Sequence, residues 1–289
     1  RLAQLTTADQ WLIYQTGQVE KEVNEYLEDM RFSDAANRIY SFTWHEFCDW
    51  YLEFSKPVLY GEDVGQKKVT QLVLAQTLNR IVRLLHPFAP FITEEIYQKL
   101  PIKNKACIID DYPEFDKDQA WLGLGSEEAS FEMELVKEVI TAIRNIRGEN
   151  SIKPGEKIAV WLAPKDDKSQ KILGSNKPEI VRLASLSECS ISERDSLKKC
   201  AVAPIRLGDS EVDVVIPLEG LVDIEKEVAR LKKSIDKQEK DIQKINGKLN
   251  NERFLANAPE DVVEADKQLL ASITSKVEEM RQSLMRLSE

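Results

Sequence analysis

Two long apolar stripes, with steps of three and four residues, constrain the fold of this 289-residue chain more than any other feature. Such spacing places apolar side chains on one side of a helix and is typical of a coiled-coil seam. The stripes have similar lengths and are separated by a break at residues 250–259, so we predict that residues 219–289 form an antiparallel coiled-coil hairpin. The first stripe is Leu221, Ile224, Val228, Leu231, Ile235, Gln238, Ile242, Ile245 and Leu249, and the second is Val263, Asp266, Leu270, Ile273, Val277, Met280, Leu284 and Leu287.

The first helix of this C-terminal hairpin carries a line of basic residues on its outer side. A step of two residues from a seam position turns about 200° round the helix axis, away from the second helix. The residues at these positions and toward the tip, which we call the basic ridge, are Lys226, Arg230, Lys233, Lys237, Lys240, Lys244, Lys248 and Arg253. The corresponding positions of the second helix carry few charges.

A one-sided basic line favours contact with a nucleic-acid backbone. No aromatic residues are interleaved with the ridge, which indicates phosphate contact and positioning without reading of bases. The ordinary alternative is a solvated face with Glu–Lys pairs along one helix. A further alternative is a protein-interaction module whose ridge docks onto an acidic protein surface.

The composition limits which partners such a ridge can bind. The net charge is −10 and the sequence pI is about 5.1, so the whole molecule repels anions and an anionic partner must be met by a local patch. No apolar run approaches the roughly 20 residues that span a bilayer, and no secretory leader is visible. We expect a soluble, cytoplasmic, monomeric chain without membrane contact. Because the sequence starts with Arg1 inside a helical pattern, we expect a piece of a larger protein.

Residues 1–122 have the apolar spacing of a helical bundle. One stripe is rich in aromatic residues at steps of four and three, and we expect this stripe to pack in the core rather than to stack on bases. It consists of Tyr40, Trp44, Phe47, Tyr51 and Phe54. Ser33 or Asp34 is the predicted N-cap of that helix, and Pro57 is its predicted end.

The apolar period changes between residues 123 and 218. A helix is expected over residues 131–146, and residues 158–162 and 212–216 alternate as strands do. Gly208-Asp209 lies between two extended runs as a β-hairpin turn, and residues 178–186 read as a short helix. We therefore predict a small α+β module here, in a chain that is otherwise mainly α.

The sequence contains no recognisable catalytic motif. Gly123-Leu124-Gly125 lacks the third glycine and the preceding strand of a phosphate-binding loop. His45, Cys48 and Asp49 occupy adjacent helical turns but have no fourth ligand nearby, and the four cysteines are scattered. We predict no catalytic residue, no metal site and no bound cofactor in this chain.

Four segments resemble the C-terminal half of class I aminoacyl-tRNA synthetases, and within that family the valyl-tRNA synthetases. They are residues 31–36 (RFSDAA), 44–53 (WHEFCDWYLE), 86–95 (HPFAPFITEE) and 248–263 (KLNNERFLANAPEDVV). The third segment is shared with isoleucyl and leucyl relatives. The fourth is similar to the tip of the valyl arm, and the cysteine-rich zinc module typical of isoleucyl enzymes is absent.

This resemblance implies a tRNA-binding fragment of a ligase that attaches valine to tRNA(Val). The family's adenylate-forming signatures, which use ATP and Mg²⁺, belong to an upstream domain and do not occur in this sequence. By the same resemblance, residues 1–122 contact the anticodon and residues 219–289 lie along the outer corner of the tRNA.

We place the anticodon contact at the break before the aromatic helix. There the sequence combines cations, a ring and an amide, a set that can stack on and hydrogen-bond an unpaired base. The residues are Arg31, Phe32, Asn37 and Arg38. Packing at a helix boundary is the alternative explanation for them. Arg144 and Arg147 are a weaker choice, because both could pair with local acids.

Overall fold

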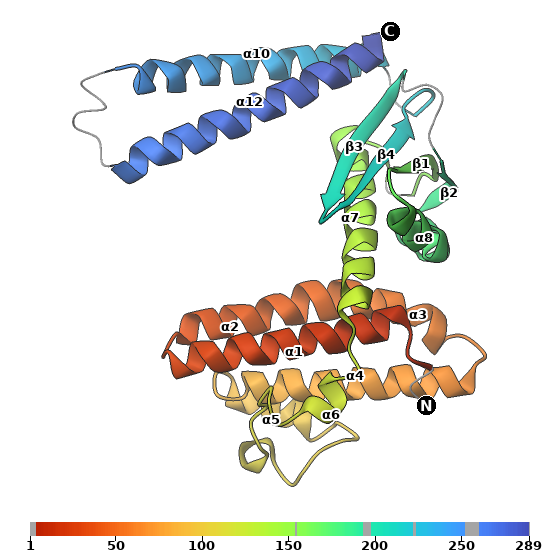
Figure 1. Cartoon of the computed structure of the whole chain (residues 1–289), viewed down its shortest axis with the longest axis vertical. Coiled ribbons are helices and arrows are strands. Elements are labelled where there is room, and N and C mark those ends of the chain that lie inside the picture. Colours follow the sequence, from red (N-terminus) through yellow and green to blue (C-terminus); the bar gives the residue numbers. More distant parts are fainter. Residues whose placement is uncertain (1–3, 154, 193–197, 222–223, 252–259, 289) are drawn as a thin grey trace. The chain divides into compact units, whose positions relative to one another are not determined.

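The computed structural model describes residues 4–153, 155–192, 198–221, 224–251 and 260–288. The chain forms two compact units, Arg1–Lys137 and Glu138–Glu289 (Figure 1). The first is helical, and the second combines a small sheet with a helical hairpin. The predicted fold class, mainly α with a small α+β part and a C-terminal hairpin, is confirmed. The finer division at residues 122 and 218 stays a prediction.

The first unit is a bundle whose core is built around α1. Trp11, Leu12 and Ile13 of this helix are fully buried. Thr6 and Asp9 close a reciprocal capping box at the start of α1, which satisfies backbone N–H groups that the helix leaves unpaired. The elements are α1 (Thr7–Glu28), α2 (Phe32–Ser41), η2 (Phe42–Tyr51), α3 (Leu52–Leu59), α4 (Val64–Leu85), α5 (Pro90–Tyr97), η3 (Cys107–Ile109), α6 (Gln119–Leu122) and the first part of α7 (Glu127–Glu149).

The turn between α1 and α2 lies where the sequence predicted a break, but the predicted N-cap is wrong. Met30 has a φ of 59°, which reverses the chain, and Arg31 N donates to Tyr26 O at 2.7 Å. The helix then restarts at once, because Arg31 O accepts the first bond, from Ala35 N at 3.1 Å. Arg31 is therefore the N-cap, and not Ser33 or Asp34.

The predicted end at Pro57 is also wrong. Proline lacks an N–H and removes one bond to the preceding turn, yet it can keep helical dihedrals. α3 continues through Pro57 to Leu59, where Tyr60 N still donates to Lys56 O at 3.0 Å. The helix therefore outlasts the proline by two residues.

The second unit contains a four-stranded sheet with the order β2-β1-β4-β3. β1 (Ile158–Pro164) and β2 (Leu186–Ile191) are parallel and are joined through α8 (Asp167–Ser175) and α9 (Lys177–Leu183). β3 (Cys200–Leu207) and β4 (Ser210–Pro217) form an antiparallel pair around Gly208-Asp209, the predicted turn. Gly208 has a φ of 55°, a conformation that glycine adopts without strain.

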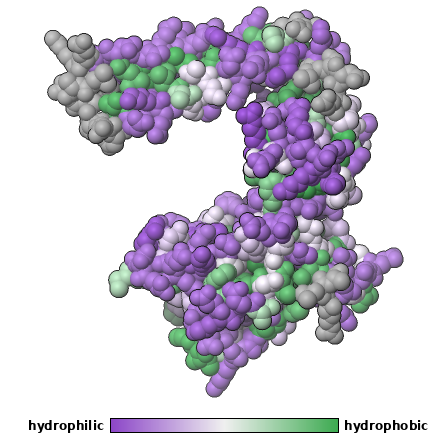
Figure 2. All heavy atoms as spheres, viewed as in Figure 1, coloured by the Kyte–Doolittle hydropathy of each residue, from purple (hydrophilic) through white to green (hydrophobic). Residues whose placement is uncertain are grey.

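The C-terminal hairpin consists of α10 (Ile224–Leu249) and α12 (Glu260–Ser288), which pack along each other (Figure 1). Figure 2 shows hydrophobic side chains gathered between these two helices and hydrophilic ones over the outer surface. Among the helices that the structure describes, none is long and apolar enough to cross a bilayer.

Candidate nucleic-acid interface

The apolar seam predicted from the sequence holds the C-terminal hairpin together. Leu231, Ile235 and Ile245 of α10 are buried, as are Val277 and Leu287 of α12. All five belong to the two predicted stripes. Burying one face of each helix leaves the opposite faces in water, and this fixes which side chains a partner can reach.

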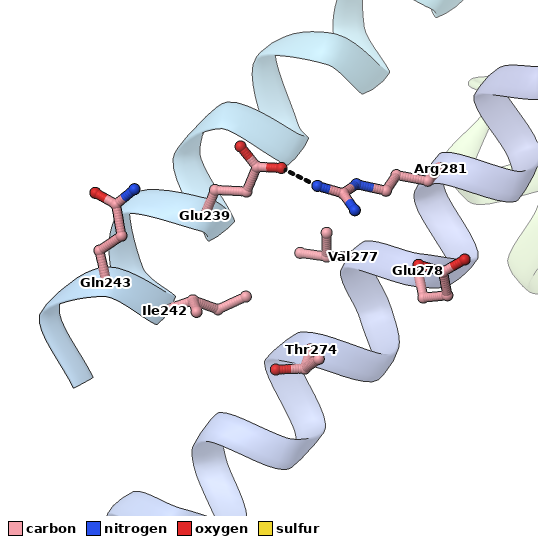
Figure 3. A pocket seen from close by; sticks show the side chains of 7 residues that line it. All are labelled: Glu239, Ile242, Gln243, Thr274, Val277, Glu278 and Arg281. Carbon is pink, nitrogen blue, oxygen red and sulfur yellow. Dashed lines mark hydrogen bonds and ion pairs between the residues drawn. The ribbon is translucent and has the colours of Figure 1, made fainter. Parts of the chain in front are cut away.

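Two ion pairs between the helices show that the hairpin is antiparallel. Arg281 pairs with Glu239 at 2.6 Å, and Asp266 pairs with Lys248 at 3.9 Å. From Glu239 to Lys248 along α10, the paired residue moves back from Arg281 to Asp266 along α12, so the two helices run in opposite directions. Figure 3 shows the first pair at the edge of a groove lined by Ile242, Val277 and Thr274. Glu239 thus lies beside the seam and pairs with a residue of the other helix.

The basic ridge lies along the outer face of α10, apart from Lys248 near the tip, whose amine reaches across to Asp266 of α12. Every ridge side chain that the structure describes is exposed, namely those of Arg230, Lys233, Lys237, Lys240, Lys244 and Lys248. The side chain of Lys226 and the whole of Arg253 lie outside the described residues. Lys244 pairs with Asp241 at 3.3 Å, and this exposed contact is weak enough to exchange for a phosphate.

The base of the hairpin is attached to the sheet. Lys199 N donates to Arg286 O at 2.8 Å, which joins the segment before β3 to the last turns of α12. Burial lowers the pKa of the Arg286 guanidinium from its ordinary value, although the thiol of Cys200 and the carboxylate of Asp213 oppose this shift. The Arg286 side chain is half-buried at this base, and the Lys199–Arg286 bond joins α12 to the segment before β3.

At the second candidate surface, the start of α2, some of the predicted residues are exposed and others are paired with acids. Phe32 is 57% exposed and Asn37 is exposed on the same helix. Arg31 pairs with Asp34 at 2.8 Å. Arg38 turns toward α1, where its guanidinium donates to Glu22. The ring and the amide are thus available to a ligand, whereas Arg38 is held against α1 and Arg31 is paired locally at the surface.

The aromatic stripe beyond this site does not lie wholly in the core. Phe47, Tyr51 and Phe54 are buried as predicted, but Tyr40 is 63% exposed and Trp44 is 53% exposed. The prediction of core packing is therefore wrong for these two rings.

The reason is that η2 is a π-helix over Phe42–Tyr51. Its bonds join residues five apart and widen each turn, so Phe42 and Phe47 share the buried side. Trp44, two residues beyond Phe42, is carried to the other side. α-Helical spacing gives no signal of this change.

Two other sequence candidates have local partners. Arg147 is buried and donates to Lys153 O at 2.9 Å and to Glu156 O at 2.6 Å, so it fixes the loop after α7. Arg144 donates to Leu183 O at 3.1 Å. His45 faces Asp49 at 3.4 Å, and no group of three potential metal ligands occurs in the part of the chain that the structure describes.

Comparison with known families gives two matches. Residues 9–162 match a family model described as the anticodon-binding domain of tRNA ligase. Residues 223–288, which include the C-terminal hairpin, match one described as the valyl tRNA synthetase tRNA binding arm. The whole basic ridge, from Lys226 to Arg253, falls within the second match.

Curated relatives agree with these matches. The chain is 52% identical over 282 residues to a valine–tRNA ligase of Bdellovibrio bacteriovorus, which covers 98% of this chain and 32% of the relative. It is 39% identical to a valine–tRNA ligase of Geobacter sulfurreducens and 34% identical to that of Enterococcus faecalis, each match covering 98% of this chain and 31% of the relative. The chain thus spans about a third of the length of these relatives. It belongs to the anticodon-binding-domain family of tRNA ligases and carries, after that domain, the tRNA-binding arm of valyl-tRNA synthetases.

Proposed function

We propose that this chain binds tRNA(Val) as the C-terminal part of a valine–tRNA ligase. The observation that carries the proposal is the exposed basic ridge on α10, within a segment similar to the tRNA-binding arm of that family. A row of exposed cations along one helix face can contact successive phosphates of an RNA strand, and neutralising phosphates releases bound counterions.

The charge of the whole chain supports a contact at the ridge. At a net charge of −10 the chain repels RNA in general, so binding depends on the surface where cations are concentrated. Ridge lysines contact phosphates and carry no base information, and they therefore position the RNA without selecting it. Selection among tRNAs falls to other residues.

In this proposal the selecting contact is made by the first unit. Arg31, Phe32, Asn37 and Arg38 stay the proposed anticodon site, with Phe32 stacking on one base and Asn37 bonding the edge of another. Arg31 and Arg38 must leave Asp34 and Glu22 to reach RNA, which makes them secondary contributors. Phe32→Ala should therefore lower discrimination between anticodons more than it lowers total affinity.

The whole protein attaches valine to tRNA(Val) in the cytoplasm as a monomer, according to the same proposal. ATP and Mg²⁺ act at a catalytic domain outside this sequence, and this chain supplies tRNA binding without a catalytic residue or cofactor of its own. The 289-residue chain should accordingly bind tRNA without forming an aminoacyl adenylate.

The test is a titration of the chain with tRNA(Val) and with an unrelated tRNA at two salt concentrations. The proposal predicts tighter binding of tRNA(Val), and affinity for both RNAs that falls steeply with salt. Equal affinity for both would remove the selective role of the first unit. If an acidic polypeptide displaced tRNA(Val) at equal charge concentration, the ridge would instead be a protein-docking surface.

A further inference from the structure

Two exposed rings lie on one side of the helical segment formed by α2 and η2. Tyr40 and Trp44 are four residues apart, which places them on neighbouring turns. Large rings are usually buried in a core or an interface, because leaving them in water forfeits the free energy of burial. Core packing does not explain these two, since Phe42 and Phe47 occupy the core side of the same segment.

The backbone that carries the rings is held from its opposite side. Tyr51 at the end of η2 donates its hydroxyl to the buried carboxylate of Asp9 at 2.5 Å. In the middle of η2, Glu46 pairs with Lys137 of α7 at 2.7 Å. A ring on a fixed backbone has only two side-chain torsions to lose, so a ligand can stack on it at low entropic cost.

The neighbouring groups indicate what kind of ligand fits. Asn37 is exposed one turn before the first ring, and its amide offers both a donor and an acceptor. Of the two arginines of the proposed anticodon site, Arg38 is held by Glu22 of α1, and Arg31 is paired with Asp34 in an exposed local contact. The surface therefore offers stacking and amide hydrogen bonds but little unpaired positive charge. A planar group with polar edges matches it better than a phosphate does.

We propose that Tyr40 and Trp44 form a stacking surface for one unpaired base of the tRNA anticodon loop, with Asn37 bonding the edge of that base. The inference rests on the proposed function, because it takes tRNA as the partner. All three residues lie within the match to an anticodon-binding domain. Unpaired bases present a face to aromatic rings and an edge to amides, whereas paired bases hide both.

The experiment uses the full chain with two RNAs, intact tRNA(Val) and tRNA(Val) lacking its anticodon stem-loop. For Tyr40→Ala/Trp44→Ala, affinity for the intact tRNA should fall about five- to 150-fold, the range for losing base stacking. The dependence on salt should not change, because no phosphate contact is lost. Affinity for the shortened tRNA should equal that of the wild type.

Three controls separate stacking from damage to the fold. Tyr60→Ala removes a ring that is 84% exposed and lies outside α2 and η2, and it should leave binding unchanged. Tyr40→Phe and Trp44→Phe keep an aromatic face and should retain most of the affinity. Subtracting the emission of Trp44→Phe from that of the wild type isolates Trp44, whose fluorescence the intact tRNA should quench and the shortened one should not.

The outcomes distinguish this inference from the function on which it rests. If the wild-type chain bound neither RNA, the proposed function would fail. If the wild-type chain bound both RNAs and the double alanine variant bound intact tRNA as tightly as the wild type does, only the inference of a stacking surface would fail. Equal weakening for both RNAs, or an unquenched Trp44, would also overturn the inference. Neither result would bear on the proposed role of the basic ridge.

Discussion

At the scale of single residues, the first unit contains a buried ion pair between Arg80 and Glu20. Arg80 is almost fully buried and contacts Glu20 at 2.6 Å and Asp118 at 2.9 Å, with Trp121 under its guanidinium at 4.5 Å. Burial raises the pKa of Glu20, although the charge of Arg80 opposes the rise. Because Asp118 is the N-cap of α6 and Trp121 lies within it, the pair attaches that segment to α1 and α4.

Removing the cation should therefore be costly. Arg80→Ala leaves Glu20 charged and buried without a partner, and it should lower the free energy of unfolding by about 3–5 kcal/mol. Glu20→Gln in the same background removes the orphaned charge and should restore part of that loss. Urea unfolding followed by tryptophan fluorescence measures both. No recovery in the double variant would mean that packing, and not charge, explains the loss.

Asp110 gives a prediction that depends on pH. Burial alone would raise the pKa of its carboxyl, but hydrogen bonds from Tyr97 at 2.5 Å and Asn104 at 2.6 Å and the charge of Arg83 lower it below the ordinary value. A carboxyl with a lowered folded pKa stabilises the fold above its unfolded pKa, about 3.9, and loses this effect as the pH falls through the folded pKa.

Asp110→Asn should accordingly reduce the Tm at neutral pH, and the difference from the wild type should narrow below about pH 4. Thermal unfolding across that range measures it. A difference that stays constant with pH would show that the carboxylate charge of Asp110 is not what stabilises residues 97–111.

At the scale of elements, the apolar seam should hold the C-terminal hairpin more strongly than its ion pairs do. Glu239 and Arg281 are both partly exposed, and exposed pairs contribute about 0.2–1 kcal/mol. A double-mutant cycle on these two residues should give a coupling within that range. A coupling well above it would make the pair, and not the seam, the main determinant of the hairpin.

A seam substitution should cost more. Ile235→Ala removes a buried side chain and should lower the stability of the hairpin by about 2–5 kcal/mol. Lys237→Ala on the outer face of α10 is the matched control and should cost little. Urea unfolding followed by circular dichroism compares the two, and similar losses would contradict the assignment of inner and outer faces.

The hairpin and the β-turn at Gly208-Asp209 could be predicted because their signals are local and periodic. The π-helix could not be predicted, since the spacing of the side chains in the sequence gives no signal for backbone bonds between residues five apart. For the same reason the sequence located the basic ridge but assigned Tyr40 and Trp44 to the core. Arg38 was misplaced on the open surface because its partner, Glu22, is on another helix.

At the scale of the whole molecule, charge is distributed unevenly. The chain is acidic overall, yet α10 has more basic than acidic side chains, and the basic ones that the structure describes belong to the ridge, apart from Lys232. An acidic body lowers the affinity for polyanions everywhere else and leaves the ridge as the favoured contact. We therefore expect these lysines to bind RNA phosphates.

The most direct test compares two quadruple variants of the full chain that remove equal charge. One is Lys233, Lys237, Lys240 and Lys244 changed to Gln, and the other is Lys171, Lys177, Lys267 and Lys276 changed to Gln, all exposed but off the ridge. The dependence of tRNA(Val) affinity on salt, as log–log slopes, is then measured for each. If each ridge lysine contacts one phosphate, the first slope should be shallower than the wild type's by about 3, at roughly 0.7–0.9 per contact, and the second nearly unchanged. Equal changes in both slopes would show that the ridge lysines are not the main contact with RNA phosphates.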